Sequence, residues 1–397
     1  MSGSTVVLRA LAALALSAPV PLSAQQLEIR VHPGDSLFTY PAGPSPAMRS
    51  LLVQAIAVVN TGTEPCEVLS VTVDALANGD VIYSAVGPPA RLNLVARALK
   101  AYETRGMLDL YDFQFQTGRL LGPEGKLASS TRLGPGEAIV ITGTPMLVTA
   151  RERELRISAT GKADDGRELT ARKDLRLAGP ASGAVLDFPL RGLWYVYAGP
   201  DMHAHHRWAA AQEFAFDLVV LGPDGRTYSG DGRRSSDYHA YGRPVLAAGD
   251  GEVAEVATSA VEDEGRFRQE GESADDFRQR SARAETALLQ SDKKAAAGNY
   301  VIIRHEDGLY SGYMHLQGGS VTVAKGDRVS RGQMIGRVGQ TGNSTEPHLH
   351  FHVTDAPDPL YARGIPVRFR DAEAVPSGYT DRFLHTGWLA RSRDSTR

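Results

Sequence analysis

The sequence has only one cysteine, Cys66, among its 397 residues. A single thiol excludes an internal disulfide and provides no set of thiolates for a structural zinc site. Its side chain is expected to pack as a small apolar group. Long apolar runs are lacking as well: beyond the N-terminal segment, no stretch approaches the length of about 18 residues that crosses a bilayer. We therefore predict no membrane span in the mature protein.

An excess of either charge is also absent. Lysine and arginine total 43 against 46 aspartate and glutamate, which gives a net charge of −3. No basic surface is predicted, so the composition gives no support for a nucleic-acid partner. Glycine and proline are abundant, at 41 and 22 residues, while long helical apolar patterns are few. This composition favours a mainly β fold with many turns, and the length is typical of two domains.

The N-terminal segment, residues 1–24, has the pattern of a signal peptide. Arg9 supplies a positive charge, residues 11–18 are rich in leucine and alanine, and the Leu-Ser-Ala sequence at 22–24 offers small residues for cleavage. The apolar stretch is too short to span a bilayer. We therefore predict an exported protein, either periplasmic or secreted.

Residues 26–180 are expected to form a β-sandwich-like accessory domain. Short runs rich in valine, isoleucine and leucine alternate with turn residues, as in an antiparallel sandwich, and residues 89–106 are expected to form a helix among the strands. This domain contains one histidine, His32, and no cluster of candidate ligands. We interpret it as a binding or positioning module. The predicted strands include residues 51–60, 66–73, 137–142 and 154–159.

Residues 184–372 are expected to form a second, antiparallel β domain that carries the chemistry. Ten of the eleven histidines lie after residue 200, and histidine is the commonest zinc ligand. Residues 373–397 are expected to form a C-terminal tail whose last residues, 390–397, are polar and disordered.

A highly charged insertion, residues 257–297, interrupts this second domain. It is predicted to be an exposed helical pair or a flexible excursion between two neighbouring strands. Its few apolar residues favour a weakly held lid over a cleft, or an arm that docks a protein partner. A solvated insertion without a role is the alternative.

The clearest chemical signal is the sequence PHLHFH at 347–352. Strict alternation places His348, His350 and His352 on one face of a strand, where packing alone would favour valine or isoleucine. Neutral imidazoles are good zinc ligands, and a metal explains why three of them stand side by side. A histidine-rich edge strand without a metal is the alternative.

Two weaker signals accompany this motif. His315 ends another β run just before a Gly-Gly turn, a position at which a lone histidine is often structural. Asp217 stands within an apolar run after the pair His205-His206, and a buried carboxylate must be paired or bound to a metal. A salt bridge from Asp217 to an arginine is the alternative. Taken together, the three features supply the nitrogen and oxygen ligands of a catalytic zinc site with an open position for water.

Four sequence segments resemble the M23 peptidase family, the lysostaphin and LytM type of zinc endopeptidase. They are GNYVIIRH at 298–305, YMHL at 313–316, GDRV at 326–329 and GQTGNSTEPHLHF at 339–351. The resemblance covers roughly residues 185–370 and leaves the first half of the chain unassigned. It implies an antiparallel-sheet peptidase domain that holds one zinc ion and cleaves peptide cross-links of peptidoglycan.

The resemblance also implies roles for individual residues. His350 and Asp217 match zinc ligands, and His348 and His315 match the two catalytic histidines. The family usually has its first ligand four residues before the aspartate, but residue 213 is Glu here. His206, in a His-Arg pair upstream, is the expected third ligand, with His205 as its rival. The family often has Glu where this chain has His352, so the role of position 352 is left open.

These observations predict a zinc-dependent endopeptidase of bacterial peptidoglycan in which His315 and His348 handle protons. One alternative is a non-catalytic regulator of other wall hydrolases, which would lack competent ligands. Another is a secreted zinc protease that acts on proteins, which only a substrate assay separates from the first. A protein partner is expected, if anywhere, at the N-terminal domain or at residues 257–297.

Overall fold

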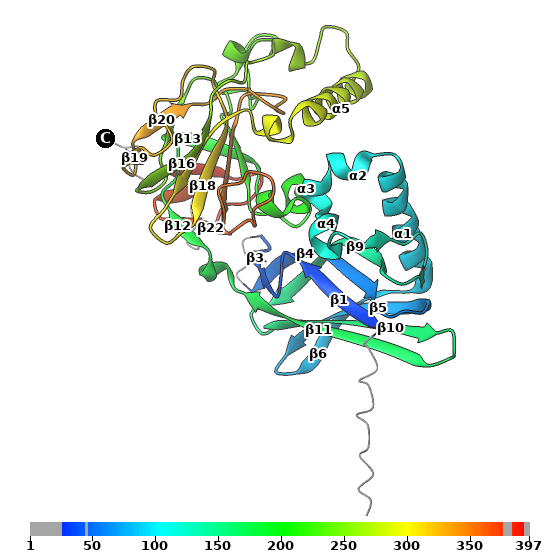
Figure 1. Cartoon of the computed structure of the whole chain (residues 1–397). Coiled ribbons are helices and arrows are strands. Elements are labelled where there is room, and N and C mark those ends of the chain that lie inside the picture. Colours follow the sequence, from blue (N-terminus) through cyan, green and yellow to red (C-terminus); the bar gives the residue numbers. More distant parts are fainter. Residues whose placement is uncertain (1–25, 44–46, 376–382, 393–397) are drawn as a thin grey trace, which may run out of the picture.

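The computed structural model describes residues 26–43, 47–375 and 383–392. The predicted signal peptide, residues 1–24, lies outside these residues. Within them the chain is mainly β, as the sequence predicts, and no helix is long and apolar enough to cross a membrane. Figure 1 shows the first half of the chain, in blue to green, below the second half, in green to red.

The first half is a sandwich of two mixed sheets, here called the N-terminal sandwich. One sheet has the order β1-β4-β9-β7 with β3 beside β4, and the other the order β2-β11-β10-β5-β6 with β8 beside β5. Most pairs are antiparallel, whereas β2–β11 and β7–β9 are parallel. The strands are β1 (Leu27–His32), β2 (Ser36–Phe38), β3 (Tyr40–Pro41), β4 (Met48–Asn60), β5 (Cys66–Ala77), β6 (Asp80–Gly87), β7 (Lys126–Leu127), β8 (Arg132–Leu133), β9 (Glu137–Thr149), β10 (Glu154–Ala163) and β11 (Glu168–Ala178).

Helices cover the outer face of the β4–β9 sheet. The residues of β4 are buried almost throughout, because Val53 and Val58 face the core between the sheets while Ala55 and Ala57 pack with helical leucines. Burial on both faces explains why this strand reads as a continuous apolar run. Cys66 is buried in the same inter-sheet core. The helices are α1 (Pro89–Thr104), α2 (Met107–Leu110), α3 (Asp112–Phe115) and α4 (Thr117–Leu121).

The second half is built on a nine-stranded sheet of order β19-β16-β17-β18-β21-β14-β13-β24-β23, whose pairings are antiparallel. Two small two-stranded sheets, β12-β22 and β15-β20, accompany it. The strands are β12 (Ala184–Leu186), β13 (Leu193–Ala198), β14 (Phe216–Val219), β15 (Pro244–Leu246), β16 (Gly251–Ala257), β17 (Asn299–Arg304), β18 (Tyr310–Leu316), β19 (Arg328–Val329), β20 (Met334–Arg337), β21 (Leu349–Thr354), β22 (Val367–Phe369), β23 (Ala372–Val375) and β24 (Leu389–Ser392).

The charged insertion is helical, but it contains one α-helix and not two. Helix α5 (Ala274–Ser291) begins where the Ser273 hydroxyl accepts the backbone N–H of Asp276, as an N-cap serine does. Strands β16 and β17 pair directly across the base of the insertion. The insertion is also better anchored than its composition predicts, because Phe267 stacks on Tyr238 and Leu289 is buried.

Residues 389–392 differ from the predicted disordered tail. They form β24, which pairs with β13 on one side and β23 on the other. Ala390 is fully buried in the core of the second half, and this packing with a paired edge outweighs the polar sequence around it. The remaining short elements are 3-10 turns: η1 (Pro180–Ser182), η2 (His205–Trp208), η3 (Ala210–Gln212), η4 (Ser235–Asp237), η5 (Glu264–Arg266) and η6 (Lys293–Ala297).

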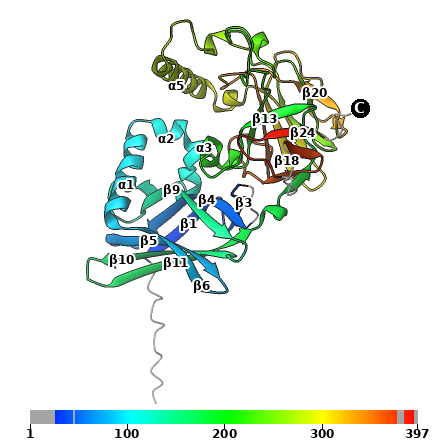
Figure 2. The ribbon, with the colours of Figure 1, turned by 180° about the vertical axis from the view of Figure 1, so that it is seen from behind.

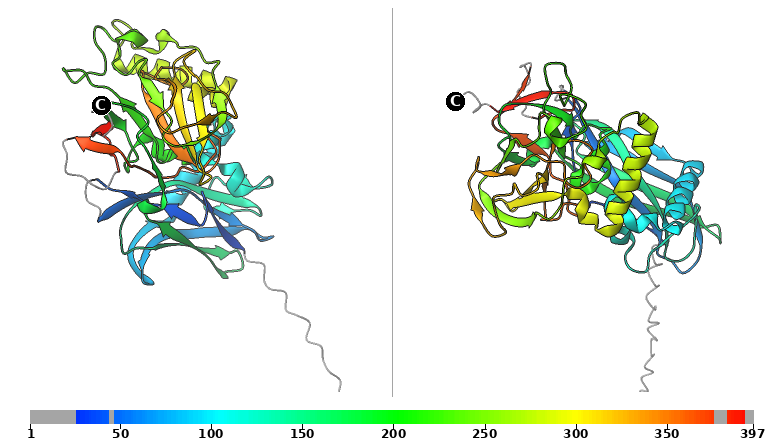
Figure 3. Two further views of the ribbon diagram at one scale, coloured as in Figure 1. Left: turned by 90° about the vertical axis from the view of Figure 1, so that its left-hand side faces the viewer. Right: turned by 90° about the horizontal axis from the view of Figure 1, so that it is seen from above.

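The two halves are packed against each other. Figures 1 and 2 show α5 of the second half facing α2 and α3 of the N-terminal sandwich from opposite views, and the top view of Figure 3 shows α5 running across the second half. Leu110 and Phe113 from the first half share an apolar cluster with Ala209, Leu289 and Leu360 from the second. A contact of this kind between distant segments leaves no local signal in the sequence.

Candidate metal and catalytic site

Three adjacent strands bring the predicted residues together. In the register of the sheet, Asp217 of β14 lies opposite His350 of β21, and His350 lies opposite Met314 of β18. The alternate residues Leu349 and Phe351 point into the core beneath the sheet. Hydrophobic alternation therefore fixes the register, and the register places the histidines of the motif on the open face.

Asp217 is the centre of the cluster. Its side chain is buried, and its ion-pair partners among the described residues are four imidazoles and no arginine, so the predicted arginine alternative does not apply to them. His206 Nε2 lies 2.8 Å from Asp217 Oδ2, and His350 Nδ1 lies 3.0 Å from Oδ1. Burial alone would raise the pKa of Asp217, but the imidazoles of His206 and His348 outweigh it and hold the pKa well below its usual range.

His205 and His206 occupy different positions around this carboxylate. His206 is buried, whereas the His205 side chain is 66% exposed and its Nε2 lies 3.7 Å from Asp217 Oδ2. The two rings are in contact, with centroids 3.9 Å apart, and their nitrogens lie within 4.8 Å of each other and of the carboxylate. Both are within reach of a common ion, but the shorter distance and the burial favour His206.

His315 and His348 face the same space from two other elements. The Nδ1 atom of His315 lies 2.8 Å from the carbonyl of Thr341, and that of His348 lies 2.8 Å from the carbonyl of Glu346. A carbonyl only accepts, so each Nδ1 carries the proton. The other ring nitrogen of His348, Nε2, lies 3.4 Å from Asp217 Oδ1. His315 has a φ of +60°, an unusual backbone conformation that aims its ring away from the strand.

The surroundings of these two histidines shift their pKa values in opposite directions. Burial, together with the neighbouring His348 and His350, holds the pKa of His315 well below its usual range. Burial also disfavours the charged form of His348, but the Asp217 carboxylate overrides this effect and raises the pKa of His348. Two titratable groups with pKa values pushed apart are typical of a site that divides acid and base roles.

His352, whose role the sequence left open, supports the neighbouring His350. Its Nδ1 lies 3.2 Å from His350 Nε2, on the side of His350 that faces away from Asp217. Gly312 lies opposite His352 in the register, and a side chain at Gly312 would come within 3.0 Å of the His352 ring. Burial lowers the pKa of both His350 and His352 to about 3, so both rings are neutral near pH 7.

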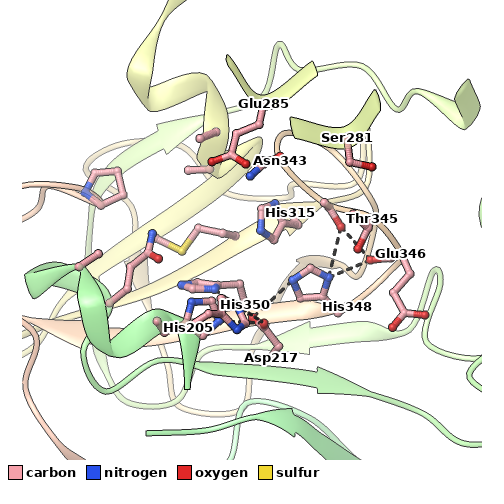
Figure 4. A pocket seen from close by; sticks show the side chains of 18 of the residues that line it. His205, Asp217, Ser281, Glu285, His315, Asn343, Thr345, Glu346, His348 and His350 are labelled. Carbon is pink, nitrogen blue, oxygen red and sulfur yellow. Dashed lines mark hydrogen bonds and ion pairs between the residues drawn. The ribbon is translucent and has the colours of Figure 1, made fainter. Parts of the chain in front are cut away.

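A cleft of about 640 Å³ opens over these residues. Figure 4 shows the histidines and Asp217 on its floor, with Ser281 and Glu285 of α5 above them. Phe113 and Gln114 of the N-terminal sandwich also line the cleft, and no sequence motif marks them. A place for the charged insertion near the cleft is what its interpretation as a lid predicts, whereas the contribution of the first half has no counterpart among the sequence predictions.

The donor set suits a zinc ion. His206 Nε2 from the η2 turn approaches Asp217 Oδ2, and His350 Nδ1 from β21 approaches Oδ1, so two imidazoles and one carboxylate are available and no thiolate is involved. The ligand atoms that lie within 4.8 Å of one another are those of His205, His206 and Asp217, and His350 joins this set through Asp217. Among the described residues, the ion-pair partners of buried Asp217 are imidazoles and no arginine or lysine, so a bound cation would add to them. Three protein ligands facing an open cleft are typical of catalytic zinc.

Comparison with known proteins identifies a family match for part of the second half. Residues 281–361 match Peptidase family M23. Peptidoglycan DD-endopeptidase ShyA of Vibrio cholerae is 46% identical over 71 residues, which are 18% of this chain and 14% of the relative. The DD-carboxypeptidase/endopeptidase Mpg of Neisseria meningitidis is 43% identical over 70 residues, 18% of this chain and 16% of the relative. The matched segments are therefore less than a fifth of either relative.

Among solved structures, a zinc-containing peptidase from Vibrio cholerae aligns over 80% of both chains, with 14% identity and a TM-score of 0.24. The family match begins within helix α5 at residue 281 and continues through strands β17 to β21, and so includes His315, His348 and His350. The second half of this chain therefore carries a region of the M23 peptidase family, as its histidine motifs predict.

Proposed function

We propose that this protein is an exported, zinc-dependent endopeptidase that hydrolyses peptide cross-links of bacterial peptidoglycan. The observation that carries the proposal is the placement of His206 and His350 against the two oxygens of buried Asp217 beneath an open cleft, with further imidazoles beside them. Zinc held by these three residues would acidify water to a pKa of about 7 and polarise the scissile carbonyl.

The protein's own groups then move the protons. With its Nδ1 held by the Thr341 carbonyl, His315 has Nε2 available to accept a proton from the attacking water, and His348, whose Nε2 lies 3.4 Å from Asp217 Oδ1, is placed to donate one to the leaving amine. The low pKa of His315 keeps its ring neutral and able to accept a proton, and the raised pKa of His348 suits an acid or an oxyanion donor. We therefore assign His315 as the base and His348 as its partner.

Peptidoglycan is the proposed substrate because the relative ShyA is, by name, a peptidoglycan DD-endopeptidase. The complete set of candidate ligands and proton carriers favours an enzyme over a regulator that has lost its metal. Export to the periplasm or beyond follows from the predicted signal peptide and from the location of this substrate.

The first experiment measures zinc content and wall digestion together. The purified mature protein should contain about one zinc per chain and release peptides from isolated peptidoglycan. His350→Ala and Asp217→Ala should lose the metal, whereas His205→Ala should retain it. A His205→Ala protein without zinc, alongside a zinc-loaded His206→Ala protein, would reverse the ligand assignment. Digestion of casein but not of peptidoglycan would replace the proposed substrate by protein.

A further inference from the structure

The turn that carries His206 is anchored in the other half of the molecule. Turn η2 (His205–Trp208) presents His206 to the cleft, but its next two residues, Arg207 and Trp208, contact strands β4 and β9 of the N-terminal sandwich. The turn that carries His206 is therefore held by contacts from both halves of the molecule.

Gln54 of β4 makes the central contact. Its side-chain amide is buried and donates to the Arg207 carbonyl at 2.8 Å and to Glu213 Oε2 at 3.1 Å. Arg207 follows His206 directly in the chain, and Glu213 lies four residues before Asp217. A single side chain from the first half thus ties together the two segments that carry His206 and Asp217.

The partners of Gln54 form a buried hydrogen-bond network. The Arg207 side chain is 1% exposed, and its guanidinium donates to Glu213 Oε1 at 3.2 Å and to the Ser50 hydroxyl of β4 at 3.1 Å. Removing one donor from such a network leaves acceptors buried without partners, which is costly and shifts the segments that carry them.

A shape contact adds to these polar contacts. Gly143 of β9 has a φ of +58°, and a Cβ atom placed on it would lie 2.1 Å from the Trp208 ring. The indole therefore rests directly on the backbone of the N-terminal sandwich. This contact fixes the C-terminal end of the η2 turn, at Trp208.

We propose that the N-terminal sandwich is a positioning element for the metal site, and that Gln54 is its principal positioning residue. Gln54 touches neither substrate nor ligand atoms, but it fixes the backbone on which His206 and Asp217 stand. This inference rests on the proposed zinc site and deepens it, because it gives the first half a role in binding the metal. Residues that orient metal ligands from behind typically change metal affinity by about 10–100-fold when they are replaced.

The test compares two full-length variants. Gln54→Met preserves the size of the side chain but removes its donor, and Val58→Ala makes a cavity in the core of the same strand without touching η2. Zinc dissociation constants are measured by competition with a chelator, and thermal unfolding is measured on the metal-free proteins. We expect both variants to lose stability, but only Gln54→Met to bind zinc about 10–100-fold more weakly. Its hydrolysis should recover when zinc is added in excess.

Each other outcome has a definite meaning. Equal zinc affinity in wild type and Gln54→Met, or an equal loss in Val58→Ala, would overturn the positioning role. A wild-type protein that binds no zinc would instead overturn the proposed function. If Gln54→Met does not fold, Ser50→Ala is used instead, because it removes one acceptor from Arg207 at a smaller cost in stability. This variant should still bind zinc more weakly than wild type. An unchanged zinc affinity of Ser50→Ala would also reject the inference.

Discussion

At the scale of single residues, we propose that different side chains bind the metal and move the protons. Asp217 and His350 lie on paired strands of the sheet, whereas the Nδ1 atoms of His315 and His348 each lie 2.8 Å from a backbone carbonyl. The carbonyl defines the tautomer of each ring, as a proton carrier requires, and Nε2 of His348 lies 3.4 Å from the Asp217 carboxylate.

Replacing either proton carrier should therefore spare the metal. We expect His315→Ala and His348→Ala to retain zinc and to lose hydrolysis by about 10²–10⁴-fold. Metal analysis and initial rates on a cross-linked peptide measure the two effects separately. A variant that cleaves at the wild-type rate would remove its residue from the mechanism.

At the scale of elements, helix α5 forms part of the wall of the cleft. Ser281 and Glu285 line the cleft from above, while Phe267 and Leu289 anchor the insertion at its two ends. The strands β16 and β17 at its base are already paired, so the sheet does not depend on the insertion. These contacts support the lid version of the insertion over a purely solvated loop.

Shortening the insertion should test the lid. We expect replacement of residues 263–291 by a flexible Gly/Ser linker to leave a folded, zinc-loaded protein, because this variant keeps Ala296, whose carbonyl accepts from the Asn343 N–H. If α5 hinders entry by about 1 kcal/mol, cleavage of a small peptide should rise roughly fivefold.

The matched control for the lid is Arg283→Ala, a change on the same helix at an exposed residue that does not line the cleft. It should leave the rate unchanged. Unchanged cleavage of both small peptide and intact peptidoglycan after shortening would leave the insertion without a role at the cleft.

At the scale of the whole molecule, the interface between the halves contains buried polar groups as well as apolar ones. His32 of β1 is 3% exposed, and burial, with smaller effects from Arg119 and Arg363, lowers its pKa to about 4. Its folded pKa is thus below the value of about 6.5 in an unfolded chain. The unfolded state then binds more protons between these two values, and stability falls as the pH drops from about 6.5 to about 4.

Removing this histidine should reduce the sensitivity to acid. Zinc is chelated in both proteins. Above about pH 6.5, the difference in free energy of unfolding between wild type and His32→Phe should be constant. Below that pH the wild type should lose stability relative to the variant, by up to about 1.4 kcal/mol per pH unit. Urea unfolding at pH 7.5, 5.5 and 4.5 measures this difference. A difference that does not vary with pH would show that His32 titrates normally.

Much of the site was readable from the sequence, because the determinants are local. The two-residue period of a strand puts His348, His350 and His352 on one face in any correct register, and the apolar residues between them fix which face is buried. The buried position of Asp217 followed in the same way from its apolar neighbours. The helix at 89–106 and the four strands expected at 51–60, 66–73, 137–142 and 154–159 were likewise predicted from local pattern and turn residues, whereas the other strands of the first half were not.

Only the tertiary structure decided which partners these residues have. His206 was preferred to His205 in the sequence by resemblance alone, and its burial beside Asp217, at the shorter distance, supplies a physical reason for that choice. The contacts from Gln54 to Arg207, from Gly143 to Trp208 and from Phe113 to the cleft join segments far apart in the chain. Such contacts depend on how the two halves pack, and that packing results from many weak interactions that leave no periodic pattern in the sequence.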